Sequence, residues 1–396
     1  MRPIYLDHHA TTPPDPRVLA AMRPWWEGNF ANPHSVEHAM GREAEAAVEA
    51  ARAEVAELIG AEPREIVLTS GATEANNLAI KGAARFAQGG MGQGERRRVI
   101  TLATEHKCVL ESVRDLAAEG YEPVILPVQP DGRLDLDVLR AALAVPTLLV
   151  SVMAANNETG VIQPLAEIGE LAKAAGALFH TDAAQAAGRL PLDVGEIGAD
   201  LLSLSGHKMY GPKGIGALYV RRRPRVRLAP LFSGGGQERG LRSGTLPAPL
   251  VVGFGEAARL AAGEGLLDAG RLRQHRDRLL GLLEARIPGL RLNGSREHRV
   301  AGNLNLTLPG VEAPALLAAL PGLCLSTGSA CSSAEVTPSY VLAAMGLPED
   351  EARRTLRIGL GRFTSPAEVE QAAGLLADAW TALSPTRHVP IGHAAE

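Results

Sequence analysis

TLLVSVM, at residues 147–153, is a continuous apolar run in the middle of the chain. Such a run is typical of a strand that is buried on both faces, as strands are in a parallel sheet covered by helices. Short β-rich runs on either side of it alternate with segments of helical spacing, which predicts an α/β fold with a mostly parallel sheet. We expect the other strands of this sheet at 65–69, 98–103, 121–128, 177–180, 199–204 and 216–220.

The pattern changes near Gly263, which indicates a second domain. Helices of the first part are expected from Thr73 on and at 107–119, 134–143 and 164–175. The second part has a charged helix at 270–286, short strands at 290–292 and 303–308, and helices at 313–320, 339–345 and 366–383. We therefore divide the chain into a large domain at 15–262, a small α+β domain at 1–14 and 263–383, and a C-terminal tail at 384–396.

Composition excludes several classes of protein. The 396 residues carry a net charge of −4 and are only 4% aromatic, which argues against a protein built mainly to bind nucleic acid. The arginine clusters at 96–98 and 221–227 are interpreted as solvated surface. The N-terminus lacks an apolar signal-peptide core, and no apolar stretch approaches the roughly 20 residues of a membrane span.

The chain has 3 cysteines, Cys108, Cys324 and Cys331, with no C-x-x-C pair. This count is too small for a disulfide framework and does not suggest an intrinsic metal site. We therefore expect reduced thiols and a cytoplasmic location.

Small, polar or ionisable residues follow five of the predicted strands. Ligands of open parallel sheets bind beyond the carboxyl ends of the strands, so we expect these residues to meet at one edge. They are Ser70-Gly71-Ala72-Thr73, Glu105-His106, Asn156-Asn157-Glu158, Asp182 with Gln185, and Ser205-Gly206-His207-Lys208.

These residues suit a phosphorylated cofactor. The first group enters a helix, whose N-terminal N–H groups and dipole favour an anion such as a phosphate. No Gly-Lys pair forms a P-loop, and the G-x-x-G-x-G at 211–216 has the wrong spacing for a dinucleotide site. A lysine, a carboxylate and a phosphate cradle together indicate pyridoxal phosphate, with Lys208 as the Schiff-base amine and Asp182 as the partner of the ring nitrogen. Gln185 can donate to the ring oxygen, and His106 can stack on the ring or act as an acid or base.

Motifs throughout the chain carry a family resemblance. The sequence resembles the cysteine desulfurases of the iron–sulfur-cluster and nitrogen-fixation type, which are fold type I members of the class V aminotransferase family. The segments are YLDHHATTP (5–13), NPHSVEH (32–38), TSGATEANN (69–77), TEHKCVLES (104–112), NNETGVIQP (156–164), HTDAAQ (180–185), SGHKMYGPKGIG (205–216), GGGQERGLRSGT (234–245), STGSACSS (326–333) and LRIGLGRFT (356–364).

The resemblance implies a role for each matching residue. It gives Lys208, Asp182, Gln185 and His106 the roles described above. Arg357 would bind the substrate carboxylate, as arginine's bidentate fork allows. The cofactor phosphate would be bound by Ala72, Thr73, Ser205 and His207, with Asn157 near the ring and substrate, and with Thr245 reaching the phosphate of the other subunit in a homodimer.

Cys331 would be the nucleophile. It lies in a small, polar, glycine-containing segment, and we expect 328–338 to form a mobile loop that carries the thiol from the substrate to an external partner. Cys324 lies in an apolar run and is interpreted as a packing residue. Cys108 opens a helix, a position that can lower a thiol's pKa, and its role stays open.

The resulting hypothesis is conversion of L-cysteine to L-alanine with a persulfide on Cys331. The sulfur would pass to an acceptor or scaffold protein for iron–sulfur cluster assembly or thiolation, and Cys331 could also ligate a transferred cluster. The alternatives are a selenocysteine lyase, a class V aminotransferase or, as a different class, a non-catalytic sulfur-binding scaffold. The identity of the acceptor stays open, as does scaffold docking through the short tail after Leu383.

Overall fold

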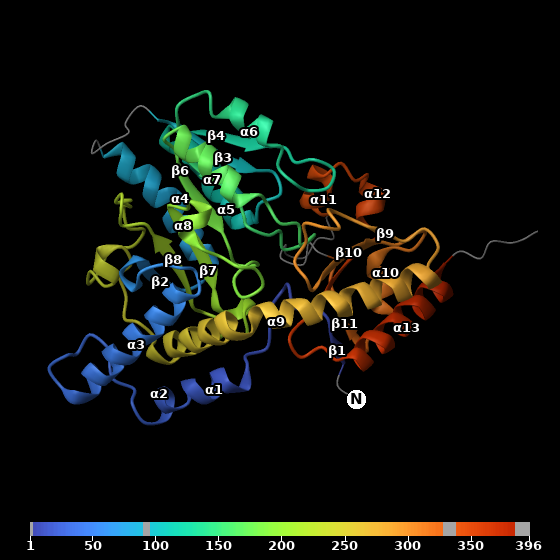
Figure 1. The fold of residues 1–396 in the computed structure, drawn as a ribbon, viewed down its shortest axis with the longest axis horizontal. Helices are drawn as coiled ribbons and strands as arrows, with labels where there is room; N and C mark the ends of the chain where they lie inside the picture. The colour runs from blue at the N-terminus through green and yellow to red at the C-terminus, as the bar shows by residue number, and fades with distance from the viewer. Residues whose placement is uncertain (1–2, 90–95, 328–337, 385–396) are drawn as a thin grey trace, which may run out of the picture.

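The computed structural model describes residues 3–89, 96–327 and 338–384. A large sheet carries helices on both faces, and a smaller lobe of helices and short strands lies beside it (Figure 1). The predicted α/β fold with a mostly parallel sheet is confirmed. Across the described ranges, no helix combines the length and apolar character needed to cross a membrane.

The large sheet has the strand order β2-β8-β7-β6-β5-β3-β4. β8 is antiparallel to both of its neighbours, whereas the pairs from β7 to β4 are parallel. Most carboxyl strand ends therefore meet at one edge, as the sequence predicts. The strands are β2 (Ile66–Thr69), β3 (Arg98–Leu102), β4 (Glu122–Leu126), β5 (Thr147–Ser151), β6 (Leu178–Asp182), β7 (Leu201–Ser205) and β8 (Gly216–Val220).

The central strand β5 is buried along its whole length. Its neighbouring residues Leu149 and Val150 belong to two different hydrophobic clusters, one on each face of the sheet. This double burial explains why the strand is apolar throughout rather than alternating.

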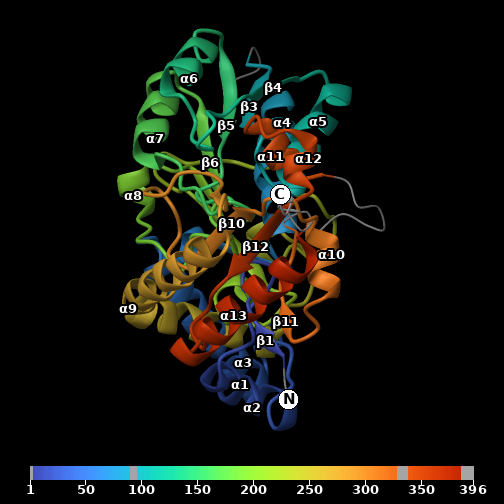
Figure 2. The same cartoon turned by 90° about the vertical axis from the view of Figure 1, so that its right-hand side faces the viewer.

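Helices cover both faces of the large sheet. Figure 2 shows α6, α7 and α8 on one side of the sheet and α4 and α5 on the other. Their bounds, with the preceding helices and the 3-10 turns, are α1 (Pro16–Met22), α2 (Pro24–Glu27), α3 (Ala39–Glu57), η1 (Pro63–Glu65), α4 (Ala72–Gln88), α5 (Lys107–Asp115), η2 (Leu116–Glu119), α6 (Leu136–Ala142), α7 (Leu165–Ala174), α8 (Val194–Ile197), η3 (Gly206–Lys208) and η4 (Glu238–Gly240).

The smaller lobe has its own sheets and core. β12 (Thr355–Gly359), β10 (Asn303–Thr307) and β9 (Arg291–Leu292) form an antiparallel sheet, and β1 (Ile4–Tyr5) pairs in parallel with β11 (Leu323–Cys324). Its helices are α10 (Ala313–Ala318), α11 (Tyr340–Ala344), α12 (Glu349–Ala352) and α13 (Pro366–Leu383). The N-terminal residues Ile4 and Leu6 lie in the same hydrophobic cluster as α13.

The helix α9 (Ala248–Arg286) joins the two lobes and differs from the sequence prediction. It runs along both of them in Figure 1, so the predicted start at Gly270 is wrong. Glycine is a poor helix former, so Gly263, Gly265 and Gly270 weaken the helical pattern over this stretch. Packing explains at least one of them, because a Cβ on Gly265 would lie 2.6 Å from the carbonyl oxygen of Gly188.

The proposed domain boundary at 262/263 therefore falls inside a continuous helix. Support for two domains comes from the cores, since Phe254 of α9 packs in the cluster of the large sheet and Leu279 in that of the smaller lobe. The division remains our proposal, and the tail from 385 onward lies outside the described residues.

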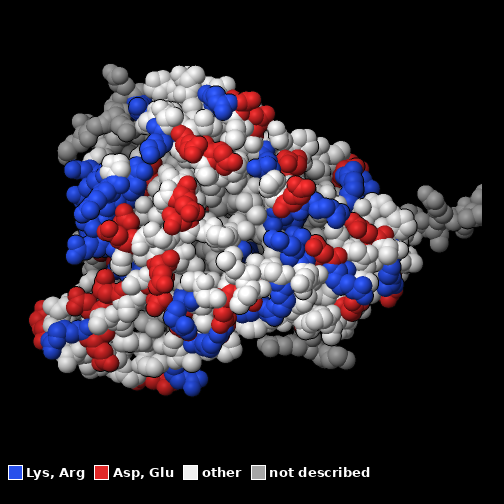
Figure 3. Space-filling view, in the orientation of Figure 1, with Lys and Arg blue, Asp and Glu red and all other residues white. Residues whose placement is uncertain are grey.

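Charged side chains of both signs are interspersed over much of the face in Figure 3, with positive charge gathered at its left edge. The predicted surface cluster at 221–227 is exposed at Arg222, Arg225 and Arg227, which line a hollow with Arg64 and Arg239.

A buried ion pair ties the segment after β8 to strand β2. Glu238 accepts from Arg52 at 2.7 and 2.8 Å and from the Leu68 N–H at 2.6 Å. The side chains of Arg52 and Glu238 are 4% and 2% exposed. The pair anchors the strand that leads into the polar turn at 70–73.

We expect Arg52→Met to destabilise the protein by about 3–5 kcal/mol, because it leaves the Glu238 carboxylate buried without its cation. Arg278→Met is the matched control, because its pair with Glu370 is exposed to solvent and its loss should leave stability almost unchanged. Chemical denaturation of both variants tests this, and equal midpoints for the two would contradict it.

Candidate active site

A cavity of about 380 Å³ lies at the carboxyl edge of the large sheet. It brings together residues that the sequence selected from separate strand ends. These are Ala72, Thr73, His106, Asn157, Asp182, Gln185, Ser205, His207, Lys208 and, from β12 of the smaller lobe, Arg357.

Lys208 ends the η3 turn that follows β7. Its Nζ donates to the carbonyl oxygens of His9 at 2.7 Å and Ala10 at 2.8 Å. Sequence reasoning missed these two residues, although they lie in the YLDHHATTP segment that contributes to the resemblance. A backbone carbonyl contact leaves no residue-type signal, so no pattern could have assigned it.

Asp182, at the end of β6, is a carboxylate with only 5% exposure. Its Oδ2 accepts from Asn76 Nδ2 at 2.7 Å and its Oδ1 from the Ala184 N–H at 2.9 Å. Within the described part of the chain it forms no ion pair. A buried carboxylate is costly without a cation, so this site suits a ligand that supplies one.

The start of α4 forms the opposite wall. Gly71 is its N-cap and offers no side chain to the first N–H groups, and a Cβ built on Gly71 meets nothing within 4 Å. These N–H groups and the helix dipole therefore face open space suited to an anion. His207 also lines this cavity. Burial, together with the positive charges of Lys208 and Lys213, lowers the pKa of His207 to about 4. His207 is therefore neutral near pH 7.

His106 caps α5 and is also neutral near pH 7. Burial lowers its pKa, against the opposing charge of Asp182. Its Nδ1 accepts from the Cys108 N–H at 3.3 Å and lies 3.0 Å from the Cys108 thiol. Because Nδ1 accepts a hydrogen bond, the ring proton lies on Nε2.

The surroundings of Cys108 contradict the expectation that its position at a helix start lowers the pKa of the thiol. Burial, with the charge of Asp182 adding, raises the pKa of Cys108 to about 12, although Asn76 Nδ2 donates to the sulfur at 3.2 Å. The residue is a protonated thiol, and its backbone N–H fixes the His106 tautomer. Desolvation outweighs the helix dipole here.

Arg357 is 1% exposed and lies between the two lobes. Its Nη2 donates to Asp7 Oδ1 at 2.8 Å and its Nη1 to the Asn157 carbonyl oxygen at 3.1 Å. Neither Arg357 Nε nor Asn157 Oδ1 has a partner among the residues that the structure describes, although both atoms are buried. A polar ligand in the cavity would satisfy such atoms.

Thr245 is not among the described residues that line the cavity, and it is exposed in the single chain. Cys331 lies outside the described residues, as does the proposed loop at 328–338 apart from Pro338. Cys324 is partly buried in β11 and pairs with Tyr5 of β1.

Comparison with known proteins shows the family of the chain. Residues 4–372 match the model of the family described as aminotransferase class-V. Cysteine desulfurase IscS of Rickettsia bellii (strain OSU 85-389) is 52% identical over 374 residues, which cover 94% of this chain and 90% of that protein. A solved NifS-like protein superposes with a TM-score of 0.88 at 34% identity, covering 96% of this chain and all of its own. A structure of SspA in complex with cysteine gives 0.80 at 38% identity, covering 91% of this chain and 100% of that one.

The chain therefore belongs to the class V aminotransferase family. Within this family it is one of the cysteine desulfurases, and it is an enzyme, as the resemblance implied.

We expect Cys108 to react with iodoacetamide at pH 8 at least a hundredfold more slowly than free cysteine, since a thiol of pKa about 12 is almost wholly protonated there. The measurement uses a variant in which Cys324 and Cys331 are replaced by serine, and the same variant unfolded in guanidinium is the control. Equally fast labelling of the folded and unfolded forms would contradict the assignment.

Proposed function

We propose that the cavity binds pyridoxal 5'-phosphate. The observation that carries the proposal is the buried Asp182 carboxylate, which accepts from Asn76 and Ala184 and lies in one cavity with Lys208. A protonated pyridine nitrogen would pair with Asp182. The α4 N-terminus at Ala72 and Thr73, together with Ser205 and His207, would bind the phosphate.

The cofactor, when bound, supplies an electron sink for charge that develops on a substrate α-carbon. Lys208 would hold it covalently and then carry the α-proton at Nζ. Neutral His106, which has its ring proton on Nε2, can exchange a proton with a neighbouring group. Arg357 Nε would bind the carboxylate of the amino acid, and Asn157 Oδ1, which only accepts, would face a donor group of the ligand.

We propose L-cysteine as the substrate and L-alanine as the product, with Cys331 as the sulfur acceptor. The Cβ–S bond breaks, its electron pair stays on carbon, and a proton completes the methyl group of alanine. The sulfur forms a persulfide with Cys331 Sγ. Support comes from the related desulfurases and from the other two cysteines, because Cys108 is a high-pKa thiol and Cys324 is in a strand.

The proposal extends to the partners. Thr245, which is exposed in one chain, would reach the cofactor phosphate of a second subunit in a homodimer. The persulfide sulfur would pass to an acceptor or scaffold protein for iron–sulfur cluster assembly or thiolation, and this exchange is suited to a reducing cytoplasm.

We expect Cys331→Ala to keep the visible absorbance of the bound cofactor and to lose at least 99% of sulfide release from L-cysteine with dithiothreitol, because no thiol accepts the sulfur. Cys324→Ala is the matched control and should keep at least half of the wild-type rate. Sulfide and alanine are measured together. Full turnover by Cys331→Ala, or keto-acid-dependent transamination by the wild type without sulfide release, would contradict the proposal.

A further inference from the structure

Arg189 makes four contacts behind the active-site cavity. It follows Gln185 by one helical turn, and its Nη1 donates to Gln185 Oε1 at 2.5 Å and lies 2.9 Å from His9 Nδ1. Its Nη2 donates to the carbonyl oxygens of His8 at 3.0 Å and Lys208 at 3.2 Å. The guanidinium thus joins the N-terminal segment to Gln185 and to Lys208.

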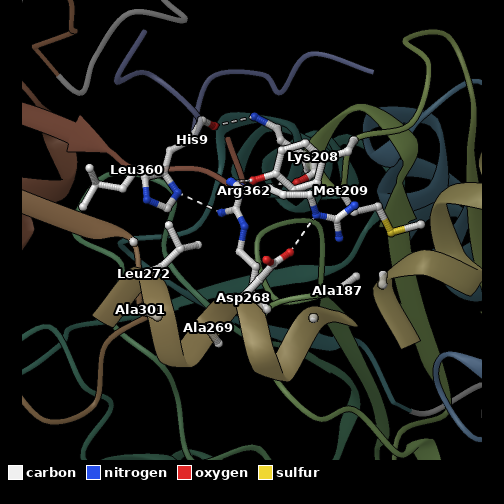
Figure 4. A pocket seen from close by; sticks show the side chains of 16 residues that line it. His9, Ala187, Lys208, Met209, Asp268, Ala269, Leu272, Ala301, Leu360 and Arg362 are labelled. Atoms are coloured by element: carbon white, nitrogen blue, oxygen red, sulfur yellow. Dashed lines mark hydrogen bonds and ion pairs between the residues drawn. The ribbon is translucent and has the colours of Figure 1, made fainter. Parts of the chain in front are cut away.

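These contacts border a second, smaller cavity of about 20 Å³. Figure 4 shows His9 and Lys208 facing each other at one end of it, with the Lys208 amine on the backbone oxygen of His9, while Asp268 pairs with Arg362 from the α9 side. Within the described ranges Arg189 forms no ion pair, so its charge is not neutralised by a carboxylate. This distinguishes it from Arg362, whose guanidinium forms ion pairs with Asp15, Glu264 and Asp268.

Hydrogen-bond chemistry fixes the orientation of the neighbouring groups. A guanidinium only donates, so a neutral His9 ring is favoured beside Arg189; its Nδ1 lies 2.9 Å from Arg189 Nη1 and 3.1 Å from Gln185 Oε1. Burial keeps the pKa of His9 well below its ordinary value, consistent with this neutral ring. Gln185 must likewise present its oxygen to Arg189, because the opposite orientation would place N–H against N–H.

The amide nitrogen of Gln185 is therefore directed away from Arg189. One of its N–H groups donates to the His9 carbonyl oxygen at 2.9 Å. The second finds no acceptor among the described residues, and Gln185 lines the main cavity. It is placed to donate to a ligand there.

We propose that Arg189 is a positioning residue that orients Gln185 toward the cofactor's ring oxygen and places an unneutralised positive charge behind that amide. The charge stabilises the deprotonated form of the cofactor, both through space and by polarising the amide. This inference rests on the proposed function. The other charged or titratable groups around Arg189 and the cavity are His8, His9, Glu74, His106, Cys108, Asp182, His207, Lys208, Tyr210, Lys213, Asp268, Arg357 and Arg362.

The experiment is a pH titration of the visible absorbance of the holoenzyme, together with the dissociation constant for added pyridoxal phosphate. We expect Arg189→Met to raise the titration midpoint by about one pH unit, because loss of a nearby positive charge favours the protonated form. We expect Arg189→Lys to have a titration midpoint close to that of the wild type, because the positive charge is kept. It should bind the cofactor several-fold more weakly, since lysine lacks the two-pronged guanidinium.

Arg96→Met is the matched control. Arg96 also donates to backbone carbonyl oxygens, including those of Thr147 and Ala175, but it lies at the opposite end of the strands. Its midpoint should equal that of the wild type, and a matching rise in Arg96→Met and Arg189→Met would overturn the inference.

An unchanged midpoint and affinity in Arg189→Met would also overturn it. If Arg189→Met does not fold, Arg189→Lys decides, and wild-type cofactor affinity in that variant contradicts the role of the fork. A wild-type protein with no visible absorbance would instead refute the proposed function itself, so the two failures are distinguishable.

Discussion

The contact on which the site depends joins Lys208 to the backbone of the N-terminal segment, at 2.7 Å from the His9 oxygen and 2.8 Å from that of Ala10. This segment starts in the smaller lobe, where Ile4 and Tyr5 pair with β11, and then crosses to the large sheet. On the way Asp7 pairs with Arg357. The cavity is therefore completed where the lobes meet, and neither lobe contains it alone.

Much of the site could be predicted because strand order and polarity are both encoded locally. Parallel strands place their carboxyl ends at one edge, so Asp182 and Lys208 had to lie near each other once their strands were recognised. The apolar run that forms β5 predicted helices on both faces of the sheet, because an apolar strand of this kind is buried on both sides. The family motifs add Arg357 to the site. This residue lies on a different sheet, so the strand positions of the large sheet could not have predicted its place in the cavity.

The parts that the sequence missed depend on tertiary packing. Gly265 is a weak helix former, and only its close approach to Gly188 shows why α9 continues through it. Cys108 stands at a helix start, yet burial controls its pKa. Arg189 contacts His9, which is 180 residues away in the sequence, and Gln185, which is four residues away. Sequence spacing reveals neither the geometry of these contacts nor the direction of their hydrogen bonds.

The central claim is that Lys208 is the residue to which the cofactor is bound, with Asp182 as its counterpart in the cavity. Lys213 lines the same cavity and is the natural competitor. Borohydride reduction of the holoenzyme, followed by peptide mass mapping, fixes the cofactor to its lysine and tests the claim most directly. We expect a phosphopyridoxyl group on Lys208 alone, whereas modification of Lys213, or of no lysine, would contradict the role of Lys208.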